Sequence, residues 1–411
     1  MSSILVFFFI ILSKLDILRV KRSSLLSGDA AGKIWAARKM RKKQKLGNSC
    51  GSEPTGKDGI KMQNVQKGKA SIAFDHPPYI TAAASVAGKK EGEGPLGSLF
   101  DVVESDEMMG EKNWEAAESK FQKKAASLAL EKGGLKPGDV RYLFAGDLLG
   151  QLIATSFGIM ELEIPLFGLY GACSTFGEAI SLAAMTVEAG YADRSLAMVS
   201  SHFATAEKQF RFPLGYGNQR AYSATWTATG AGAVVIESSH PWTDGAGEAE
   251  PHAIAKISGV TTGKIVDFGL KDSTNMGAAM APAAFHTIWQ HFQDFGRSEK
   301  DYDKIITGDL GTIGQTILLD LLRKEGYDLA GNHMDCGIEL FDSQSQDTHA
   351  GGSGCGCSAI TLCSYILPKI QDGTWKRVLF VPTGALHSTV SYNEGQSVPG
   401  IAHGVVLEHI G

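Results

Sequence analysis

The spacing of hydrophobic and polar residues switches between strand-like and helix-like patterns along most of this chain. Short apolar runs typical of buried strands occur at residues 140–145, 164–170 and 196–201. Segments with helical spacing lie between them, among them residues 114–132, a charged surface helix, and residues 176–189, an Ala/Leu/Met-rich packed helix. Strands and helices that follow one another in this way predict an α/β fold in layers.

The second part of the chain repeats the first. Three pairs of segments match in the same order: residues 146–151 with 308–315, 173–196 with 356–379, and 231–237 with 403–408. Ordered matches of this kind predict an internal duplication, with two similar α/β halves packed about a pseudo-twofold axis. We expect Cys173 and the glycine-rich loop at residues 351–357 to occupy equivalent turns that face each other near this axis.

Three regions follow from these patterns: an extra N-terminal segment at residues 1–65, and two α/β halves at residues 66–240 and 241–411. The apolar run at residues 4–12 is shorter than the roughly 20 residues needed to span a bilayer, and no small-residue cleavage site follows it. We therefore expect neither a transmembrane segment nor a signal peptide there. The basic stretch at residues 14–45 either lies on anionic lipid, or is disordered, or precedes a true start at Met40 or Met62.

Composition narrows the class of protein. With 411 residues, 43% of them hydrophobic and 20% charged, the chain is globular and long enough for two domains. A net charge of -5 lacks the excess of positive charge that is typical of nucleic-acid-binding proteins, so we expect no nucleic-acid partner. The six cysteines are too few and too unevenly spaced for a disulfide framework. Cys355, Cys357 and Cys363 have partial metal-site spacing without an evident fourth ligand, and we expect no metal site.

Cys173 lies on the turn between the apolar run at 164–170 and the helix at 176–189. Thr175, followed three residues later by Glu178, matches a capping box, which places the free amides of the helix start beside the sulfur. Such amides stabilise a thiolate or another anion, so Cys173 is a candidate nucleophile or anion contact. The alternative is a small buried thiol that fills space behind a turn.

The Gly-Ala-Cys turn, its helix and the repeated halves resemble the thiolase and β-ketoacyl synthase superfamily. Within it, four segments resemble the stage V sporulation protein AD family of endospore-forming bacteria: residues 171–175, 200–211, 273–284 and 350–359. The resemblance covers residues 70–408 and leaves residues 1–65 outside. It implies a thiolase-like, five-layered αβαβα fold built from two duplicated halves, and a homodimer.

For function, the resemblance implies a sporulation protein that binds dipicolinic acid, pyridine-2,6-dicarboxylate, and assists its uptake into the developing spore. Its expected partners are membrane proteins of the same stage V sporulation A operon. Its expected location is the inner membrane of the forespore and spore, as a peripheral protein. We expect no cofactor, apart from Ca²⁺ that arrives with the ligand.

The enzymes of this superfamily combine the cysteine nucleophile with a His/His or His/Asn pair from the second half. The corresponding positions of this chain hold Asp309 and Ser353, and neither side chain can replace imidazole. A retained nucleophile position without its partners favours a binding pocket derived from a catalytic one. The alternatives are a β-ketoacyl-synthase-type acyltransferase with Cys173 as nucleophile, and a structural subunit that binds no small molecule.

A pocket for a flat, aromatic dianion needs amide donors, one or two cations and a narrow apolar slot. The predicted ligand-binding residues are Cys173, Ser174, Thr175, His202, Arg211, Ser353 and Gly354. We expect Arg211 to supply the positive charge of the pocket. The alternative is that Arg211 lies on a surface loop with its guanidinium in solvent. His202, which follows the strand at 196–201, either binds a carboxylate or is a buried histidine with local partners.

Overall fold

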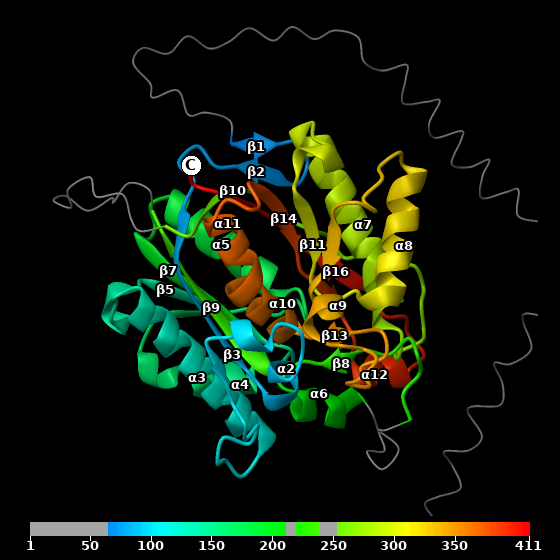
Figure 1. Cartoon of the computed structure of the whole chain (residues 1–411), viewed down its shortest axis with the longest axis horizontal. Helices are drawn as coiled ribbons and strands as arrows, with labels where there is room; N and C mark the ends of the chain where they lie inside the picture. Colours follow the sequence, from blue (N-terminus) through cyan, green and yellow to red (C-terminus); the bar gives the residue numbers. More distant parts are fainter. Residues whose placement is uncertain (1–64, 211–218, 239–252) are drawn as a thin grey trace, which may run out of the picture. The chain divides into compact units, whose positions relative to one another are not determined.

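The computed structural model describes residues 65–210, 219–238 and 253–411. The extra segment predicted for residues 1–65 lies outside this part except for its last residue, and so does Arg211. Strands and helices alternate through the described chain, as the hydrophobic pattern predicted (Figure 1).

Five strands of the first half form a sheet. Their bounds are β3 Tyr79–Ala87, β5 Tyr142–Asp147, β6 Leu166–Gly168, β7 Arg194–Ser201 and β9 Gly230–Glu237. They pair in the order β6-β5-β7-β9-β3. β5 is parallel to β6 and β7, whereas β9 is antiparallel to β7 and β3.

Five strands of the second half repeat this arrangement. Their bounds are β10 Ala255–Thr261, β11 Lys304–Thr307, β12 His333–Asp335, β14 Arg377–Val381 and β17 Gly404–Glu408. The order β12-β11-β14-β17-β10, with the same parallel and antiparallel pairs, is that of the first half. The two halves are therefore duplicates, as the repeated segments predicted. Pairing between β10 and β3 joins them edge to edge. The exact residue at which one half ends stays a prediction.

Short elements complete the described chain. The remaining strands are β1 Gln66–Lys67, β2 Ser71–Ala73, β4 Val102–Val103, β8 Trp226–Thr227, β13 Gly352–Ser353, β15 Thr383–Ala385 and β16 Gly400–Ala402. The short helices are α2 Lys89–Gly92, α4 Ile153–Gly158, α6 Phe203–Phe210, α9 Cys336–Leu340, α11 Leu367–Gln371 and α12 Thr389–Asn393. Single 3-10 turns occur at Gly97–Leu99, Pro137–Asp139, Met160–Leu162 and Glu299–Asp301.

Four long helices and the shorter α10 form the layers around the sheets. They are α3 Trp114–Lys132, α5 Thr175–Glu188, α7 Met276–Phe295, α8 Gly311–Lys324 and α10 Cys355–Thr361, which continues through a π-helical turn, Leu362–Ile366, into α11. Figure 1 shows α5 and α10 near the middle, with α3 and α4 on one side and α7 and α8 on the other.

The alternation of side chains along the strands explains these layers, because successive residues of a strand point to opposite faces of the sheet. On β9, Ile236 packs into the central core with Phe176 of α5, whereas Val235 packs into an outer core with Phe121 of α3. One half thus has a helix layer on each face.

The second half follows the same rule. On β17, Leu407 belongs to the central core with Ile360 of α10, whereas Val406 packs with Met280 of α7 in a third core. Both halves share the α5 and α10 layer, and the order of layers is helix, sheet, helix, sheet, helix. This is the predicted αβαβα fold.

Some local predictions were wrong. The run at 164–170 was predicted as a buried strand, but β6 spans Leu166–Gly168 and its three residues are exposed, because β6 is the edge of the sheet and has only β5 beside it. The helix at 114–132 has the predicted bounds, yet Glu118, Gln122 and other residues of its inner face are buried.

Candidate functional site

The predicted turn around Cys173 forms between β6 and α5. Ala172 adopts a left-handed conformation with φ 51°, which turns the chain sharply before the helix. A side chain at Gly171 would meet Ser174 Oγ at 2.6 Å, so the turn needs a glycine there. Strand β15 of the second half packs closely on this turn, because a Cβ atom on Gly384 would lie 2.2 Å from the Gly171 carbonyl oxygen.

The capping box predicted at the start of α5 is not formed. The helix begins at Thr175 itself, and its N-cap residue, Ser174, makes no side-chain cap hydrogen bond. The Thr175 hydroxyl instead donates to the Ala172 carbonyl oxygen at 2.6 Å, and the Ser174 hydroxyl donates to the Gly171 carbonyl oxygen at 2.7 Å. Both hydroxyls therefore stabilise the turn and point back along it.

The second half brings Ser353 to the cysteine. Cys173 Sγ lies 3.9 Å from Ser353 Oγ, within hydrogen-bond distance for sulfur. Ser353 ends β13, which pairs with β8, and Gly354 follows with φ 96°, a conformation that favours glycine. This contact confirms the prediction that the two equivalent turns face each other.

Asp309 holds the second-half side of the site together. Its carboxylate accepts hydrogen bonds from Ser353 Oγ at 3.1 Å, the Gly354 amide at 2.9 Å and Thr383 Oγ1 at 2.7 Å. Burial raises the pKa of Asp309, and the hydrogen bonds that it accepts oppose this rise. The Asp309 carboxylate is thus fully engaged in hydrogen bonds within the protein.

The expected stabilisation of a thiolate at Cys173 is not supported. Burial and the nearby Asp309 carboxylate raise the pKa of the Cys173 thiol well above its ordinary value. Only 4% of the cysteine is exposed. Both effects favour the neutral thiol over the thiolate.

We therefore expect slow alkylation of Cys173 in the folded protein. Iodoacetamide at pH 8 should modify it more than ~10-fold more slowly than free cysteine, because the thiolate is the reactive form. Mass spectrometry of the peptide that contains Cys173 measures the rate, and the same protein in urea is the control. A rate in the folded protein equal to that of free cysteine would contradict this prediction, and a faster rate would show an activated nucleophile.

The space beside Cys173 is small. We call it the inner cavity; its volume is about 20 Å³, enough for about one water molecule. It is lined by Leu148, Tyr170, Ala172, Cys173, Phe210, Thr227, Met276, Ser353, Ala385 and His387.

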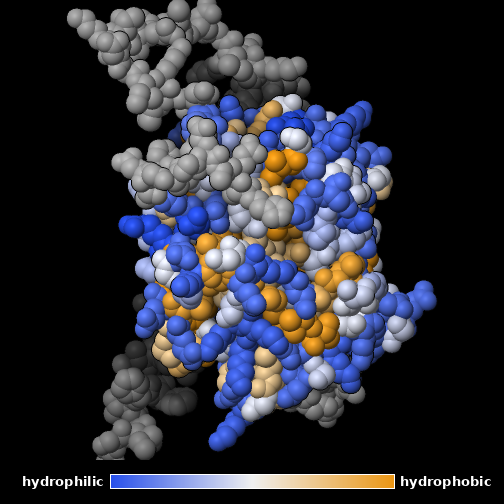
Figure 2. Space-filling view, turned by 60° about the vertical axis from the view of Figure 1, so that its left-hand side comes forward, coloured by the Kyte–Doolittle hydropathy of each residue, from blue (hydrophilic) through white to orange (hydrophobic). Residues whose placement is uncertain are grey.

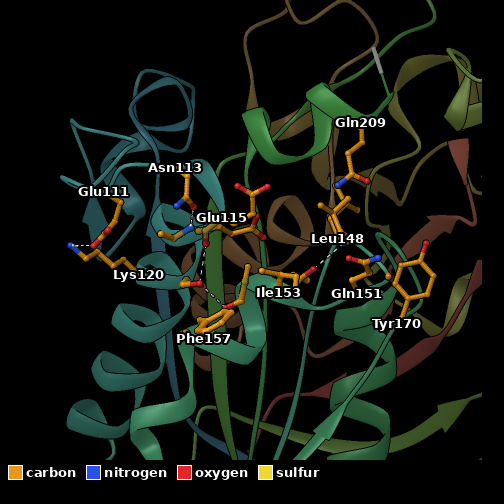
Figure 3. A pocket seen from close by; sticks show the side chains of 18 of the residues that line it. Glu111, Asn113, Glu115, Lys120, Leu148, Gln151, Ile153, Phe157, Tyr170 and Gln209 are labelled. Atoms are coloured by element: carbon orange, nitrogen blue, oxygen red, sulfur yellow. Dashed lines mark hydrogen bonds and ion pairs between the residues drawn. The ribbon is translucent and has the colours of Figure 1, made fainter. Parts of the chain in front are cut away.

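A much larger hollow adjoins the inner cavity. This outer hollow has a volume of about 960 Å³ and lies over α3, α4 and the loop after β5 (Figure 3). Four residues line both spaces and form the wall between them: Leu148, Tyr170, Phe210 and His387. In Figure 3, Tyr170 and Gln151 lie on one side of the hollow, and Glu111 and Lys120 lie on the other.

The outer hollow is lined by both apolar and polar side chains and contains charges of both signs. Its acids are Glu111, Glu115, Glu118, Asp147 and Glu161, its lysines are Lys120 and Lys123, and its amides are Asn113, Gln151 and Gln209. Lys120 pairs with Glu111 at 2.6 Å, and Lys123 pairs with Glu161. The two lysines and their partners thus neutralise each other.

Two of these acids are buried and carry less charge than their number suggests. Burial raises the pKa of Glu118 to about 8, and the neighbouring Asp147 carboxylate adds to the rise. The pKa of Asp147 is also raised by burial, although hydrogen bonds from Thr155 and Leu149 oppose it. Glu118 accepts hydrogen bonds from Ser200 at 2.8 Å and Thr205 at 2.7 Å. We infer that Glu118 is protonated at pH 7.

Comparisons with known proteins decide the family. The family described as Stage V sporulation protein AD matches residues 68–408. Stage V sporulation protein AD of Bacillus subtilis (strain 168) is 43% identical over 344 residues, which are 84% of this chain and 98% of that protein. This chain belongs to the stage V sporulation protein AD family. The resemblance of the four motif segments is confirmed, and the family assigns the chain a role in sporulation.

Solved structures are similar to this family member at low sequence identity. Human mitochondrial 3-ketoacyl-CoA thiolase is 12% identical and matches with a TM-score of 0.50, over 82% of this chain and 100% of that one. The 3-oxoacyl-[acyl-carrier-protein] synthase III of Aquifex aeolicus VF5 is 14% identical, with a TM-score of 0.48, over 81% of this chain and 100% of that one. The thiolase match agrees with the layers and the duplication described above.

The fold of this family member places only some of the predicted ligand-binding residues next to one another. Cys173 and Ser353 line the inner cavity, and Gly354 follows Ser353, with its amide bonded to Asp309. His202 lies elsewhere: its Nε2 is 3.0 Å from the Glu107 carbonyl oxygen, and its Nδ1 accepts the Ala204 amide at 3.1 Å. This placement matches the alternative of a buried histidine with local partners.

Other features of the site were missed by sequence reasoning. His387 follows a short strand, and nothing in its neighbourhood marks it as a site residue. Glu118 lies on a helix that the sequence presented as a surface element. Within the described ranges, no group of His, Cys, Asp and Glu side chains could hold a metal ion. Among the helices of these ranges, none is long and apolar enough to cross a bilayer.

Proposed function

We propose that this protein binds dipicolinic acid and assists its uptake into the developing spore. The observation that carries the proposal is a hollow of about 960 Å³ that adjoins the small inner cavity beside Cys173. Ligand pockets commonly have volumes of about 300–1,000 Å³. Family membership supports the sporulation role.

The ligand enters through the outer hollow and lies against the wall formed by Leu148, Tyr170, Phe210 and His387. Aromatic rings on this wall suit a flat pyridine ring. One carboxylate points toward the inner cavity, near Cys173 and Ser353, which has room for a group about the size of one water molecule. Arg211 directly follows Phe210 in the sequence, and its guanidinium supplies the positive charge that pairs with a carboxylate of the ligand.

The chemistry of Cys173 favours binding over acyl transfer. An acyl-transfer nucleophile needs a lowered pKa or an adjacent base, whereas the pKa of this thiol is raised by burial and by Asp309. The hydroxyl of Ser353 donates to Asp309 and is therefore no base. The alternative function, an acyltransferase, is tested by intact-mass measurement after incubation with acyl-CoA thioesters. An acyl adduct that forms on Cys173 and is then released would support the acyltransferase.

Calorimetry with dipicolinate tests the proposal. We expect saturable heat with one site per chain, and weaker binding of Cys173→Ala and Arg211→Ala. Benzene-1,3-dicarboxylate, which lacks the ring nitrogen, and pyridine-2-carboxylate, which lacks one carboxylate, are the matched ligands. The titration is repeated in the presence of Ca²⁺, because dipicolinate itself chelates this ion. We propose no cofactor that the protein holds on its own. Absence of heat from the wild-type protein would contradict the proposal.

A homodimer is the second part of the proposal. The edge strand β6 exposes Leu166 and Phe167, and Phe157 and Met160 are also exposed, at 64% and 63%. Hydrophobic patches are visible on the face of the molecule shown in Figure 2. An unpaired apolar edge is a template for pairing with another strand. Sedimentation equilibrium should give a dimer, and Phe167→Lys should give a monomer.

We also propose that the protein acts at the inner spore membrane as a peripheral protein, with membrane proteins of the stage V sporulation A operon as partners. Family membership is the support for this part. Membrane fractions of sporulating cells should contain the protein, and deletion of those membrane proteins should release it. A protein that stays in the membrane fraction after their deletion would contradict the partnership.

A further inference from the structure

His387 occupies the boundary between the inner cavity and the outer hollow. It lines both spaces and is only 7% exposed. Both of its ring nitrogens are buried and have no hydrogen-bond partner among the residues that the structure describes. The backbone around it is fixed, because its own amide donates to the Ala385 carbonyl oxygen and the Leu386 amide donates to the Pro399 carbonyl oxygen.

The other buried histidines of the described chain have partners. His291 contacts Thr261 Oγ1 with Nδ1 and Tyr302 Oη with Nε2, and His202 uses both nitrogens in backbone contacts. His403 is as buried as His387, yet its Nδ1 accepts the Gly263 amide at 3.3 Å. In the described ranges, His387 alone combines two buried nitrogens that have no partner.

Such a side chain has an energetic cost. A buried polar group without a partner destabilises a fold by about 1–3 kcal/mol, and native structures contain few of them. The neighbours of His387 do not remove this cost: Phe210 meets its ring edge-on at 5.0 Å between centroids, and Tyr392 lies at 5.8 Å. The two nitrogens are therefore available to a ligand.

We propose that His387 is a ligand-binding residue that hydrogen-bonds a carboxylate of an aromatic dicarboxylic acid held between the two spaces. This inference rests on the proposed function and adds a specificity residue to it. An imidazole N–H donates to the carboxylate oxygen, while the edge-on Phe210 ring provides the apolar side of the slot. Loss of this donor removes recognition of one carboxylate, whereas the contacts with the ring remain.

Two substitutions test the inference in the full-length protein. His387→Phe keeps a ring in the space and removes both nitrogens, and His387→Gln keeps a donor. We expect His387→Phe to weaken dipicolinate binding at least ~10-fold in calorimetry, with an unchanged or higher melting temperature, because a costly group is removed. His387→Gln should retain binding within ~5-fold. Pyridine-2-carboxylate should bind wild type and His387→Phe with similar affinity.

His403→Gln is the matched control, since His403 is equally buried and does not line either space. Its dipicolinate affinity should equal that of the wild type. Equal binding by wild type and His387→Phe would overturn the inference and leave the proposed function intact. A parallel fall in affinity and melting temperature of His387→Phe would show a structural role and also overturn it. A wild-type protein that does not bind dipicolinate would overturn both.

Discussion

Replacement of Asp309 by alanine is expected to lower the free energy of unfolding by about 4 kcal/mol, because three buried donors lose their acceptor. The donors are Ser353 Oγ, the Gly354 amide and Thr383 Oγ1. Ser353 belongs to β13 and Thr383 to β15, so the carboxylate links these two strands beside the inner cavity. Urea unfolding followed by circular dichroism measures the change.

Asp320→Ala is the control for this experiment. Asp320 is 61% exposed and pairs with Arg323, three residues away on the same helix. Loss of such a surface pair is expected to cost less than about 0.5 kcal/mol. A loss below about 1 kcal/mol for Asp309→Ala would contradict the central structural role that we give to this carboxylate.

Glu118→Gln is expected to change how stability depends on pH. Burial raises the pKa of Glu118 in the folded protein from 4.5 to about 8, so the folded state binds this proton more tightly than the unfolded state does. The stabilisation is fully present below the unfolded value and is lost as pH rises through the folded value. Between pH 5 and 8.5, the wild type should lose about 4 kcal/mol more than Glu118→Gln, which has no proton to release.

Unfolding in urea at several pH values measures this difference. Glu131→Gln, at an exposed position of the same helix, is the control and should follow the wild type. Parallel pH profiles of the wild type and Glu118→Gln would mean that Glu118 is already charged in the folded protein at pH 7. The outer hollow would then carry one more negative charge than we infer.

The fold could be predicted well because its signals are periodic and repeated. The bounds of α3 match the predicted helix, and α5 differs from its prediction by one residue at each end. Repeated segments indicated duplicated halves, and their register placed Cys173 opposite the loop of Ser353. These features depend on local pattern and on order along the chain, which a single sequence contains.

Other features depend on tertiary packing, which the sequence does not display. β6 has a core-like sequence and yet is exposed, because its position in the order of strands decides its burial. Thr175 has the sequence of a cap, but its hydroxyl is used by the Ala172 carbonyl group. His387 can be identified as a candidate only from the folded structure, where it lines the inner cavity. There, both of its ring nitrogens have no hydrogen-bond partner among the described residues.

A crystal structure of the protein with dipicolinate would test the central claim most directly. We predict electron density for a flat ring in the outer hollow against Tyr170 and Phe210, with one carboxylate toward Cys173 and Ser353. An empty hollow at saturating ligand, or a ring bound at another surface of the protein, would contradict the account.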